Sequence, residues 1–450
     1  MFSCTREPEV KSPNTLTIAS TADAKRLLPM LASDSASSGI SGNIFNGLTK
    51  YNKDIVIVGD LAESWEISPD GLTIIFNLRK GVKWQDGKPF TADDVIFTYN
   101  TVINPNVPTP YSSNYGPVDK VVKLDSHRVM VKYKEPYAVA LEAWGMGIIP
   151  RHIYEGKDLT KPDVNRNPIG TGPYRLKEWV SGQKITLEAF EQYYEKRPNI
   201  DKIITRVIPD TATMFLELKF GGIDYMGLTP PQYKLQAQGS HFNRYFQKFR
   251  FPSFSYTYLG FNLLNPLFSD VRVRRALSHA INKHDIISGV LLGYGTVCTG
   301  PFPPESWAYN PDAKGPDYSK EKALELLREA GWSLENGILK KDGKAFVFNV
   351  LVNQGNEARL KTAQIIKEQL REIGVEVNIK VLEWQAMLHE FINKKRFEAV
   401  ILGWALSRDP DSYDIWHSSK TKEGEFNFVS YKNEEVDRLL LEGRRTFDIE

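Results

Sequence analysis

The hydrophobic pattern is most regular toward the C-terminal end of the chain, where strand and helix patterns alternate. Residues 345–352 and 397–404 are nearly continuous apolar runs, and residues 375–381 alternate apolar with polar positions. Residues 356–373 and roughly 385–394 instead repeat apolar side chains at helical spacing. This order predicts a β-α-β-α-β unit, in which crossover helices connect parallel strands. Buried parallel strands are apolar on both faces, as two of these three runs are.

The carboxyl ends of the three predicted strands meet at one edge of the sheet. Ligands of open α/β sheets bind outside that edge. The segments that leave it carry two tryptophans, two amides and two aspartates, namely Asn353, Gln354, Trp384, Trp404, Asp409 and Asp411. The loop after the third strand, GWALSRDPDSYDIWHSS (403–419), is therefore predicted to face a ligand.

The first part of the chain predicts a mixed α+β lobe. Residues 72–78 alternate apolar and polar side chains after a Ser-Pro-Asp-Gly turn, which indicates a strand. Thr91, with Asp94 three residues later, predicts the capped start of a helix. The segment NPIGTGPY (167–174) is rich in chain-breaking residues and is a candidate crossing between lobes. It lacks the Gly-Lys-Ser/Thr ending of a phosphate loop.

Composition narrows the class of protein. A chain of 450 residues is too long for one core and predicts about three domains or lobes. The chain has 57 basic and 55 acidic residues and no Lys/Arg-rich block, so nothing argues for nucleic acid or an anionic membrane as a partner. The sequence has no run of about 18 apolar residues, which is the length that a membrane-spanning helix needs. The 12% aromatic content suits a chain that lines a ligand cleft with rings.

The acidic loop raises the alternative of a glycosidase, with Asp409, Asp411 or Asp414 as the catalytic acids. That chemistry needs two carboxylates at a defined separation, one of them with a raised pKa. Three aspartates this close together on a proline-containing loop indicate neither the required separation nor a raised pKa. Ligand contact or turn chemistry is therefore favoured for them. The seven histidines are scattered, and neither H-E-x-x-H nor G-x-S-x-G occurs. We therefore expect a protein that is not an enzyme and has no cofactor and no metal site.

The small-residue segment SDSASSGISG (33–42) has two interpretations. It is either a flexible loop or plain helix start, or the start of a helix that presents free N–H groups to a ligand. Apolar residues at helical spacing follow it. Ser33 and Ser35 are candidate ligand contacts on the second interpretation.

Five blocks of the chain occur in a characteristic order. They are LAESWEISPDGLTIIFNLRKGVKWQDGKPFTADDV, NPIGTGPYRL, FNLLNPLFSDVRVRRALSHAIN, YSKEKALELLREAGW and ILGWALSRDPDSY. Together they resemble the family 5 extracellular solute-binding proteins, the receptors of peptide, nickel and oligosaccharide ABC importers. The resemblance covers nearly the whole chain.

This resemblance implies an α/β (mixed α+β), two-lobed fold of the periplasmic-binding-protein type (type II, cluster C) with an extra inserted domain. Residues 1–13 would form an N-terminal tether, and residues 14–43 plus 168–256 would form lobe I. Residues 44–167 would be the inserted domain and residues 257–450 lobe II. The family's C-terminal return to lobe I is expected to be missing from this chain.

The resemblance also assigns ligand contacts. Trp384 and Trp404 match two tryptophans that line the cleft of peptide-binding members. In those members an aspartate three residues after the second tryptophan binds the α-amino group of the ligand, and Ser407 stands at that position here. Asp409 or Asp411 would then be the acidic partner, or the ligand has no free amine there. An oligopeptide is the expected ligand and an oligosaccharide the alternative, with a secreted glycosidase or peptidase as the rival from another class.

The start of the chain, MFSC, resembles the end of a bacterial lipobox, so Cys4 is a candidate lipidation site. The alternative is an unmodified thiol near the terminus. The family implies a monomer that acts with ABC permease membrane subunits at the periplasmic or extracellular face of the cell membrane. The expected mechanism is hinge closure of the lobes around the ligand.

Overall fold

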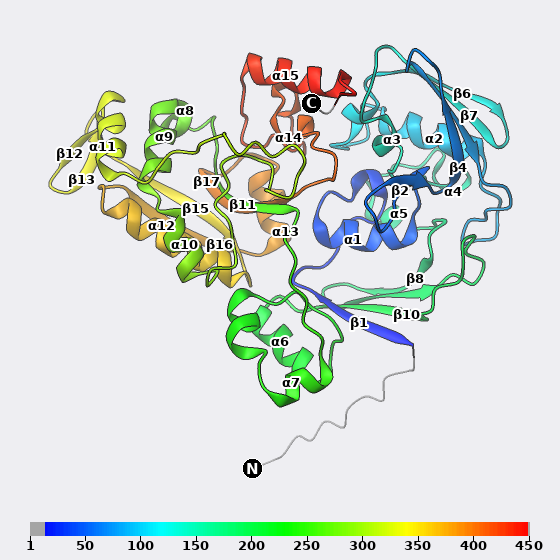
Figure 1. The fold of residues 1–450 in the computed structure, drawn as a ribbon, viewed down its shortest axis with the longest axis horizontal. Helices are drawn as coiled ribbons and strands as arrows, with labels where there is room; N and C mark the ends of the chain where they lie inside the picture. The colour runs from blue at the N-terminus through cyan, green and yellow to red at the C-terminus, as the bar shows by residue number, and fades with distance from the viewer. Residues whose placement is uncertain (1–13, 449–450) are drawn as a thin grey trace.

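The computed structural model describes residues 14–448, which form two large bodies with a smaller helical part beneath their junction (Figure 1). Residues 14–207 build one body and residues 255–448 build the other. The segment between them forms the smaller part. Cys4 lies outside the described residues, so its lipidation stays a prediction.

Lobe I is built around a four-stranded sheet in the order β1-β10-β9-β8. Its strands are β1 (Thr15–Ser20), β8 (Tyr174–Val180), β9 (Lys184–Ala189) and β10 (Lys202–Val207). β1 pairs with β10 in parallel, and the other pairs are antiparallel. The short helix η1 (Pro29–Leu31) and helix α1 (Ser35–Ile44) follow β1, and α1 packs against β8.

The inserted segment has its own antiparallel sheet in the order β4-β5-β7-β6. The strands of this sheet are β4 (Ala62–Ile67), β5 (Thr73–Leu78), β6 (Val118–Asp125) and β7 (Arg128–Tyr133). The strands β2 (Thr49–Tyr51) and β3 (Ile57–Gly59) form a separate pair. Its helices are α2 (Ala92–Val102), η2 (Ser112–Tyr115), α3 (Ala140–Ala143), α4 (Arg151–Tyr154) and α5 (Pro162–Arg166).

The sequence predictions for this segment are confirmed. Ile74, Phe76 and Leu78 of β5 are buried, as the alternation predicts. Thr91 and Asp94 form the expected capping box of α2. One continuous hydrophobic core joins the inserted segment to lobe I, because it runs from Ala24 to Ala189. The inserted segment and lobe I are therefore packed as one body, and the division of the chain near residues 44 and 168 stays a prediction.

Lobe II contains the predicted β-α-β-α-β unit. Its sheet has the order β11-β17-β15-β16, with strands β11 (Ser255–Phe261), β15 (Val347–Asn353), β16 (Glu376–Leu382) and β17 (Ala399–Ala405). β15 pairs in parallel with both β16 and β17, which confirms the predicted direction of all three strands. β11 adds an antiparallel edge beside β17.

The remaining elements of lobe II cover this sheet or extend from it. They are α8 (Pro266–Ser269), α9 (Val271–Ala280), α10 (Lys283–Gly289), α11 (Lys320–Glu329), β12 (Ser333–Glu335), β13 (Ile338–Lys341), β14 (Lys344–Ala345), α12 (Glu357–Arg371), α13 (Trp384–Ala386), η4 (Met387–Ile392), α14 (Tyr413–Trp416), η5 (Ser418–Lys420) and α15 (Glu434–Arg445). The second crossover, predicted as one helix over 385–394, is instead one short helical turn followed by the π-helix η4. Its wider turns are closed by bonds five residues apart, such as the one from the Asn393 N–H to the Leu388 carbonyl.

The segment between the two bodies, residues 208–254, forms what we call the α6–α7 module. It contains α6 (Thr211–Lys219), the π-helix η3 (Gln232–Gln236) and α7 (Ser240–Tyr245). The module has a small hydrophobic core of its own, which includes Phe215 and Phe242. A β-bridge between Ile18 and Tyr225 ties it to β1. The sequence assigned this segment to lobe I without detecting its separate core.

The glycines of NPIGTGPY allow the inserted segment to approach α1. The N–H of Gly172 donates to the carbonyl oxygen of Ile44 over 2.7 Å, and the side chain of Gln85 bonds to the backbone of Gly170 and Tyr174. A Cβ atom at Gly170 would collide with the Ile44 carbonyl. The segment is thus a close backbone crossing at the end of α1.

We predict that Gly170→Ala lowers the free energy of unfolding by roughly 1–3 kcal/mol, because backbone must move to admit the methyl group. The control is Gly39→Ala, since a Cβ there meets nothing within 4 Å and the residue lies inside helix α1. That control is expected to be neutral or stabilising by about 0.5–1 kcal/mol. Chemical denaturation of both variants tests this, and equal stabilities would contradict the close crossing.

Candidate ligand-binding cleft

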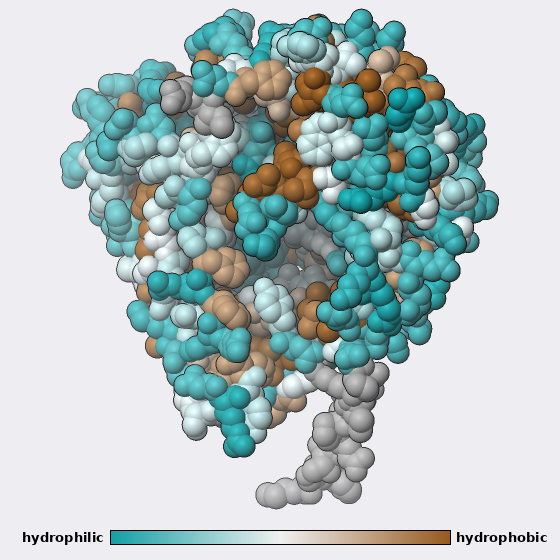
Figure 2. Space-filling view, turned by 45° about the vertical axis from the view of Figure 1, so that its right-hand side comes forward, coloured by the Kyte–Doolittle hydropathy of each residue, from teal (hydrophilic) through white to brown (hydrophobic). Residues whose placement is uncertain are grey.

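A cavity of about 1320 Å³ lies between the lobes. The molecule is visibly hollowed there in the space-filling view (Figure 2). Its wall comes from the start of α1, from the inserted segment around α3, and from the ends of β11 and β17 with the loop after β17. This volume exceeds the range of about 300–1,000 Å³ that is typical of sites for small ligands.

Most of the predicted contact residues lie on the wall of this cavity. They are Ser33, Ser35, Trp384, Trp404, Ser407, Asp409 and Asp411. Asn353 and Gln354 do not line it. The buried Asn353 side chain instead accepts a hydrogen bond of 2.8 Å from Nη1 of Arg359, and the N–H of Gln354 donates to the backbone of Leu382. Arg359, which the sequence analysis missed, lies on the wall in their place.

Aromatic packing holds Trp404 at the cavity wall. Its ring is stacked on Tyr258 at a centroid distance of 6.4 Å and an angle of 11°. Phe426 and Phe428 contact the same tryptophan at 5.4 and 5.8 Å. Trp384 and Trp404 are both partly buried and pack against one hydrophobic cluster beneath the cavity. The two tryptophans are therefore fixed flat surfaces for a ligand to cover.

The start of α1 is capped by its own chain. The carboxylate of Asp34 accepts the N–H of Ser37 at 3.0 Å, and the Ser37 hydroxyl donates to the same carboxylate at 2.7 Å. The N–H of Ser37 is therefore not free to bind a ligand, because Asp34 already accepts its hydrogen bond. The interpretation of this helix start as a source of free N–H groups is wrong at that residue. Ser33 and Ser35 remain on the wall beside it.

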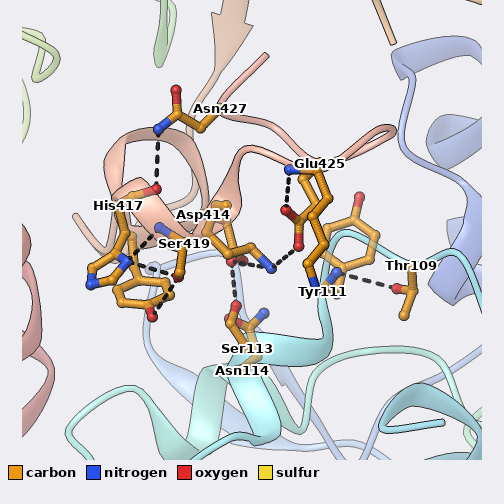
Figure 3. A network of polar contacts seen from close by, with 12 residues as sticks. Thr109, Tyr111, Ser113, Asn114, Asp414, His417, Ser419, Glu425 and Asn427 are labelled. Carbon is orange, nitrogen blue, oxygen red and sulfur yellow. Dashed lines mark hydrogen bonds and ion pairs between the residues drawn. The ribbon is translucent and has the colours of Figure 1, made fainter. Parts of the chain in front are cut away.

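Two aspartates of the acidic loop are held by structural ion pairs. Asp411 accepts hydrogen bonds from Nε and Nη2 of the buried Arg444, at 3.0 and 2.6 Å. Asp414 accepts the hydroxyl of Ser113 and lies 3.4 Å from Nζ of Lys420, which also contacts Glu425 (Figure 3). Burial raises the pKa of Asp414. These contacts occupy Asp411 and Asp414, and the bond from Ser113 fastens the loop to the inserted segment.

Two other carboxylates of the cavity wall belong to Glu142 and Asp409. Ser407 Oγ and the hydroxyl of Tyr51 both donate to the carboxylate of Glu142. Burial raises the pKa of Glu142 to about 7, and burial also raises the pKa of Asp409. Among residues 14–448 neither carboxylate forms an ion pair. Sequence reasoning missed Glu142 because it lies 265 residues before Ser407 and on another lobe.

The cavity also contains buried polar groups of other kinds without a partner. The guanidinium of Arg359 forms no ion pair within the described part of the chain, and burial lowers its pKa. The hydroxyl of Tyr256 and Oε1 of Gln385 have no hydrogen-bond partner among residues 14–448, and both residues line the cavity. Buried polar groups are normally satisfied, so these atoms are suited to hydrogen bonds with a ligand.

Contacts across the cavity mouth show that the lobes are closed on each other. Nζ of Lys25 lies 2.8 Å from Nδ1 of His389, and Nε2 of Gln385 donates to the backbone of Asp23 at 3.2 Å. The rings of Tyr111 and Phe426 meet edge to face at 5.6 Å.

No helix within residues 14–448 has the length and hydrophobicity needed to cross a membrane. Within the same range, no group of three or more histidine, cysteine, aspartate or glutamate side chains is arranged to hold a metal ion.

Comparison with known proteins places this architecture in a family. The family model for the bacterial extracellular solute-binding proteins, family 5 Middle, matches residues 56–426. The oligopeptide-binding protein AppA of Bacillus subtilis is 38% identical over 433 residues, which cover 93% of this chain and 78% of AppA. Heme-binding protein A of Haemophilus influenzae is 31% identical over 426 residues, which cover 89% of this chain and 76% of that protein.

Solved structures that are similar to this chain are also those of solute-binding proteins. AppA from Bacillus subtilis in complex with a nonapeptide has a TM-score of 0.88 at 35% identity, with 96% of this chain and 87% of that chain covered. NikZ from Campylobacter jejuni in complex with Ni(L-His) has a TM-score of 0.89 at 30% identity, with 97% and 87% covered. These matches confirm the predicted fold and favour a solute receptor over an enzyme. By the extent of the family match and by these identities, the chain belongs to the bacterial extracellular solute-binding proteins of family 5.

Proposed function

We propose that this protein is the extracytoplasmic receptor of an ABC importer and that it binds oligopeptides. The observation that carries the ligand class is a pair of partly buried charges in the cavity that form no ion pair within residues 14–448, the carboxylate of Glu142 and the guanidinium of Arg359. A peptide brings an amine and a carboxylate that neutralise both, whereas a neutral oligosaccharide brings neither. The nonapeptide bound by the related AppA supports the same class.

The two tryptophans cover the body of the ligand in this proposal. Polar atoms of Tyr256, Gln385 and Ser407 then bond to its main chain, which allows many side chains to be accepted. Asn353 acts indirectly, because it orients Arg359. Ser33, Ser35 and Asp409 line the same cavity and contact the ligand, while Asp411 holds the loop in place.

In this proposal Glu142 supplies the carboxylate that is missing at position 407, where this chain has a serine. The Ser407 hydroxyl donates to the Glu142 carboxylate, so the serine positions an acid from the inserted segment instead of carrying one. Asp409 adds negative charge beside it, since its proximity contributes to the raised pKa of Glu142. The α-amino group of a peptide is the cation that this pair is suited to bind.

The transport cycle follows from closure of the lobes. The ligand enters between them, contacts such as Lys25–His389 form as the lobes approach, and the closed surface is recognised by the permease membrane subunits. The proposed division is a tether over 1–13, lobe I over 14–43 and 168–256, an inserted domain over 44–167, and lobe II over 257–450. Lipid on Cys4 would hold the monomeric receptor at the outer face of the cell membrane.

We predict that Trp384→Ala and Trp404→Ala each weaken peptide binding by about 1–3 kcal/mol, as expected for a buried aromatic anchor. The matched control is Trp65→Ala in β4, which removes a tryptophan away from the cavity and should leave the affinity unchanged. Calorimetric titration with a peptide recovered from the purified protein measures all three. Wild-type affinity in both cleft variants would refute the assignment of the cleft.

We predict that Glu142→Gln weakens binding of a peptide with a free N-terminus by roughly 1–3 kcal/mol but has little effect on the N-acetylated form of the same peptide. Glu66→Gln is the control, because Glu66 is an exposed carboxylate of β4. The readout is the ratio of the two dissociation constants. An equal loss for both peptides would show that Glu142 does not bind the amine.

The same carboxylate predicts a pH dependence. Since the pKa of Glu142 is raised to about 7, the group becomes neutral as the pH falls from 8 to 6 and its attraction for the amine is lost. Above about pH 8 the α-amino group itself begins to lose its proton. Affinity is therefore expected to be highest near pH 7 to 8. An unchanged acid limb in Glu142→Gln would contradict this cause.

A further inference from the structure

The α6–α7 module carries large apolar side chains on its surface. Phe220 is 83% exposed, Phe249 is 72% exposed, Phe251 is 70% exposed and Tyr245 is 61% exposed. These residues belong to α7, the end of α6 and the segment that leads into lobe II. Large rings this exposed on a module with its own hydrophobic core indicate a surface that another body covers.

The part of the chain around α7 carries only positive formal charges. From Tyr225 to Ser269 the sequence contains no aspartate or glutamate, although acids and bases are almost equal in number over the whole chain. The basic residues of this stretch are Lys234, Arg244, Lys248 and Arg250. Rings and cations therefore alternate along RYFQKFRF (244–251).

Three of these cations lie near two tyrosines, Tyr233 of the module and Tyr294 of lobe II. The rings of Tyr233 and Tyr294 meet at 5.7 Å. Nζ of Lys248 lies 5.2 Å from the first ring, and Cζ of Arg250 and Nζ of Lys234 lie 5.5 and 5.8 Å from the second. None of the three cations forms an ion pair with a carboxylate anywhere in residues 14–448.

The nearest acids of the module are already engaged. Glu217 pairs with Arg206 at 2.6 Å, Asp224 accepts the N–H of Thr17 at 2.8 Å, and Asp210 caps α6. The positive charge of the 244–251 segment thus has no counterpart on the module itself. An anionic partner would supply one.

We propose that the exposed face of the α6–α7 module docks on an anionic lipid surface. Aromatic rings are enriched at the headgroup level of membranes, and lysines and arginines are attracted by anionic headgroups. The alternation of both along one exposed segment fits that interface. The module also lies at the same end of the molecule as β1, where the described chain begins (Figure 1). This face would be a second membrane contact, in addition to the anchor expected at Cys4, and it does not depend on lipidation or on the ligand class.

The test is co-sedimentation of the unlipidated chain with vesicles of phosphatidylcholine alone or with about one third phosphatidylglycerol. Binding is expected for the anionic vesicles only, and it should be lost in about 1 M salt, where the Debye length is about 3 Å. The double variant Arg244→Gln/Arg250→Gln should weaken partitioning by roughly fivefold for each cation, or about 25-fold in total. Phe249→Ser/Phe251→Ser should also weaken it.

The matched control is Lys80→Gln/Lys83→Gln, which removes the same charge from exposed positions of the inserted segment. It should bind the vesicles like wild type, while a wild-type circular dichroism spectrum and melting temperature in all variants show that each is folded. Three results would each overturn the proposal: no binding to anionic vesicles, equal binding to both kinds of vesicle, or equal weakening by the control. Binding only to native membranes that contain the permease would also overturn it and indicate a protein partner.

Discussion

The parallel pairing of β15 with β16 and β17 determines where the ligand cavity lies. Because the three strands run in the same direction, the chain leaves each of them at the same edge of the sheet. Arg359 follows β15 in the first turns of α12, and Trp384 begins α13 directly after β16. Trp404 lies near the end of β17, and the antiparallel neighbour β11 brings Tyr258 against its ring. One pairing pattern therefore gathers a cation and two aromatic surfaces that are distant in sequence.

The buried charges of the cleft fall into two groups with different consequences. Asp411 with Arg444 and Asp414 with Lys420 are paired, and the bond from Ser113 to Asp414 joins the loop after β17 to the inserted segment. Glu142 and Arg359 form no ion pair within residues 14–448. Removing such charges from water costs free energy, which their hydrogen bonds to neighbouring side chains offset only in part. The raised pKa of Glu142 expresses that cost. A ligand that carries both charges offsets it, which couples binding to closure.

The sequence predicted the features that depend on local patterns. Periodicity located β15, α12, β16 and β17, and turn and cap chemistry located β5 and α2. The contact of Glu142 with Ser407 was not predictable, because it joins two lobes across 265 positions and leaves no local signal. Asn353 was correctly placed at the strand end, but Arg359 reaches the cavity instead, because the direction of a side chain depends on packing. The absence of acids from Tyr225 to Ser269 was readable from the sequence, yet near-neutral composition over the whole chain concealed it.

The most direct test of this account is native mass spectrometry of freshly purified protein, followed by release of the bound material and tandem sequencing. The closed receptor is expected to carry a set of peptides of mixed sequence that are released on unfolding. Those peptides should have free N-termini and should bind again to the refolded protein. A ladder of hexose masses in place of peptides would contradict the peptide assignment. A protein that carries nothing and binds none of a defined peptide pool would contradict the account of the cleft itself.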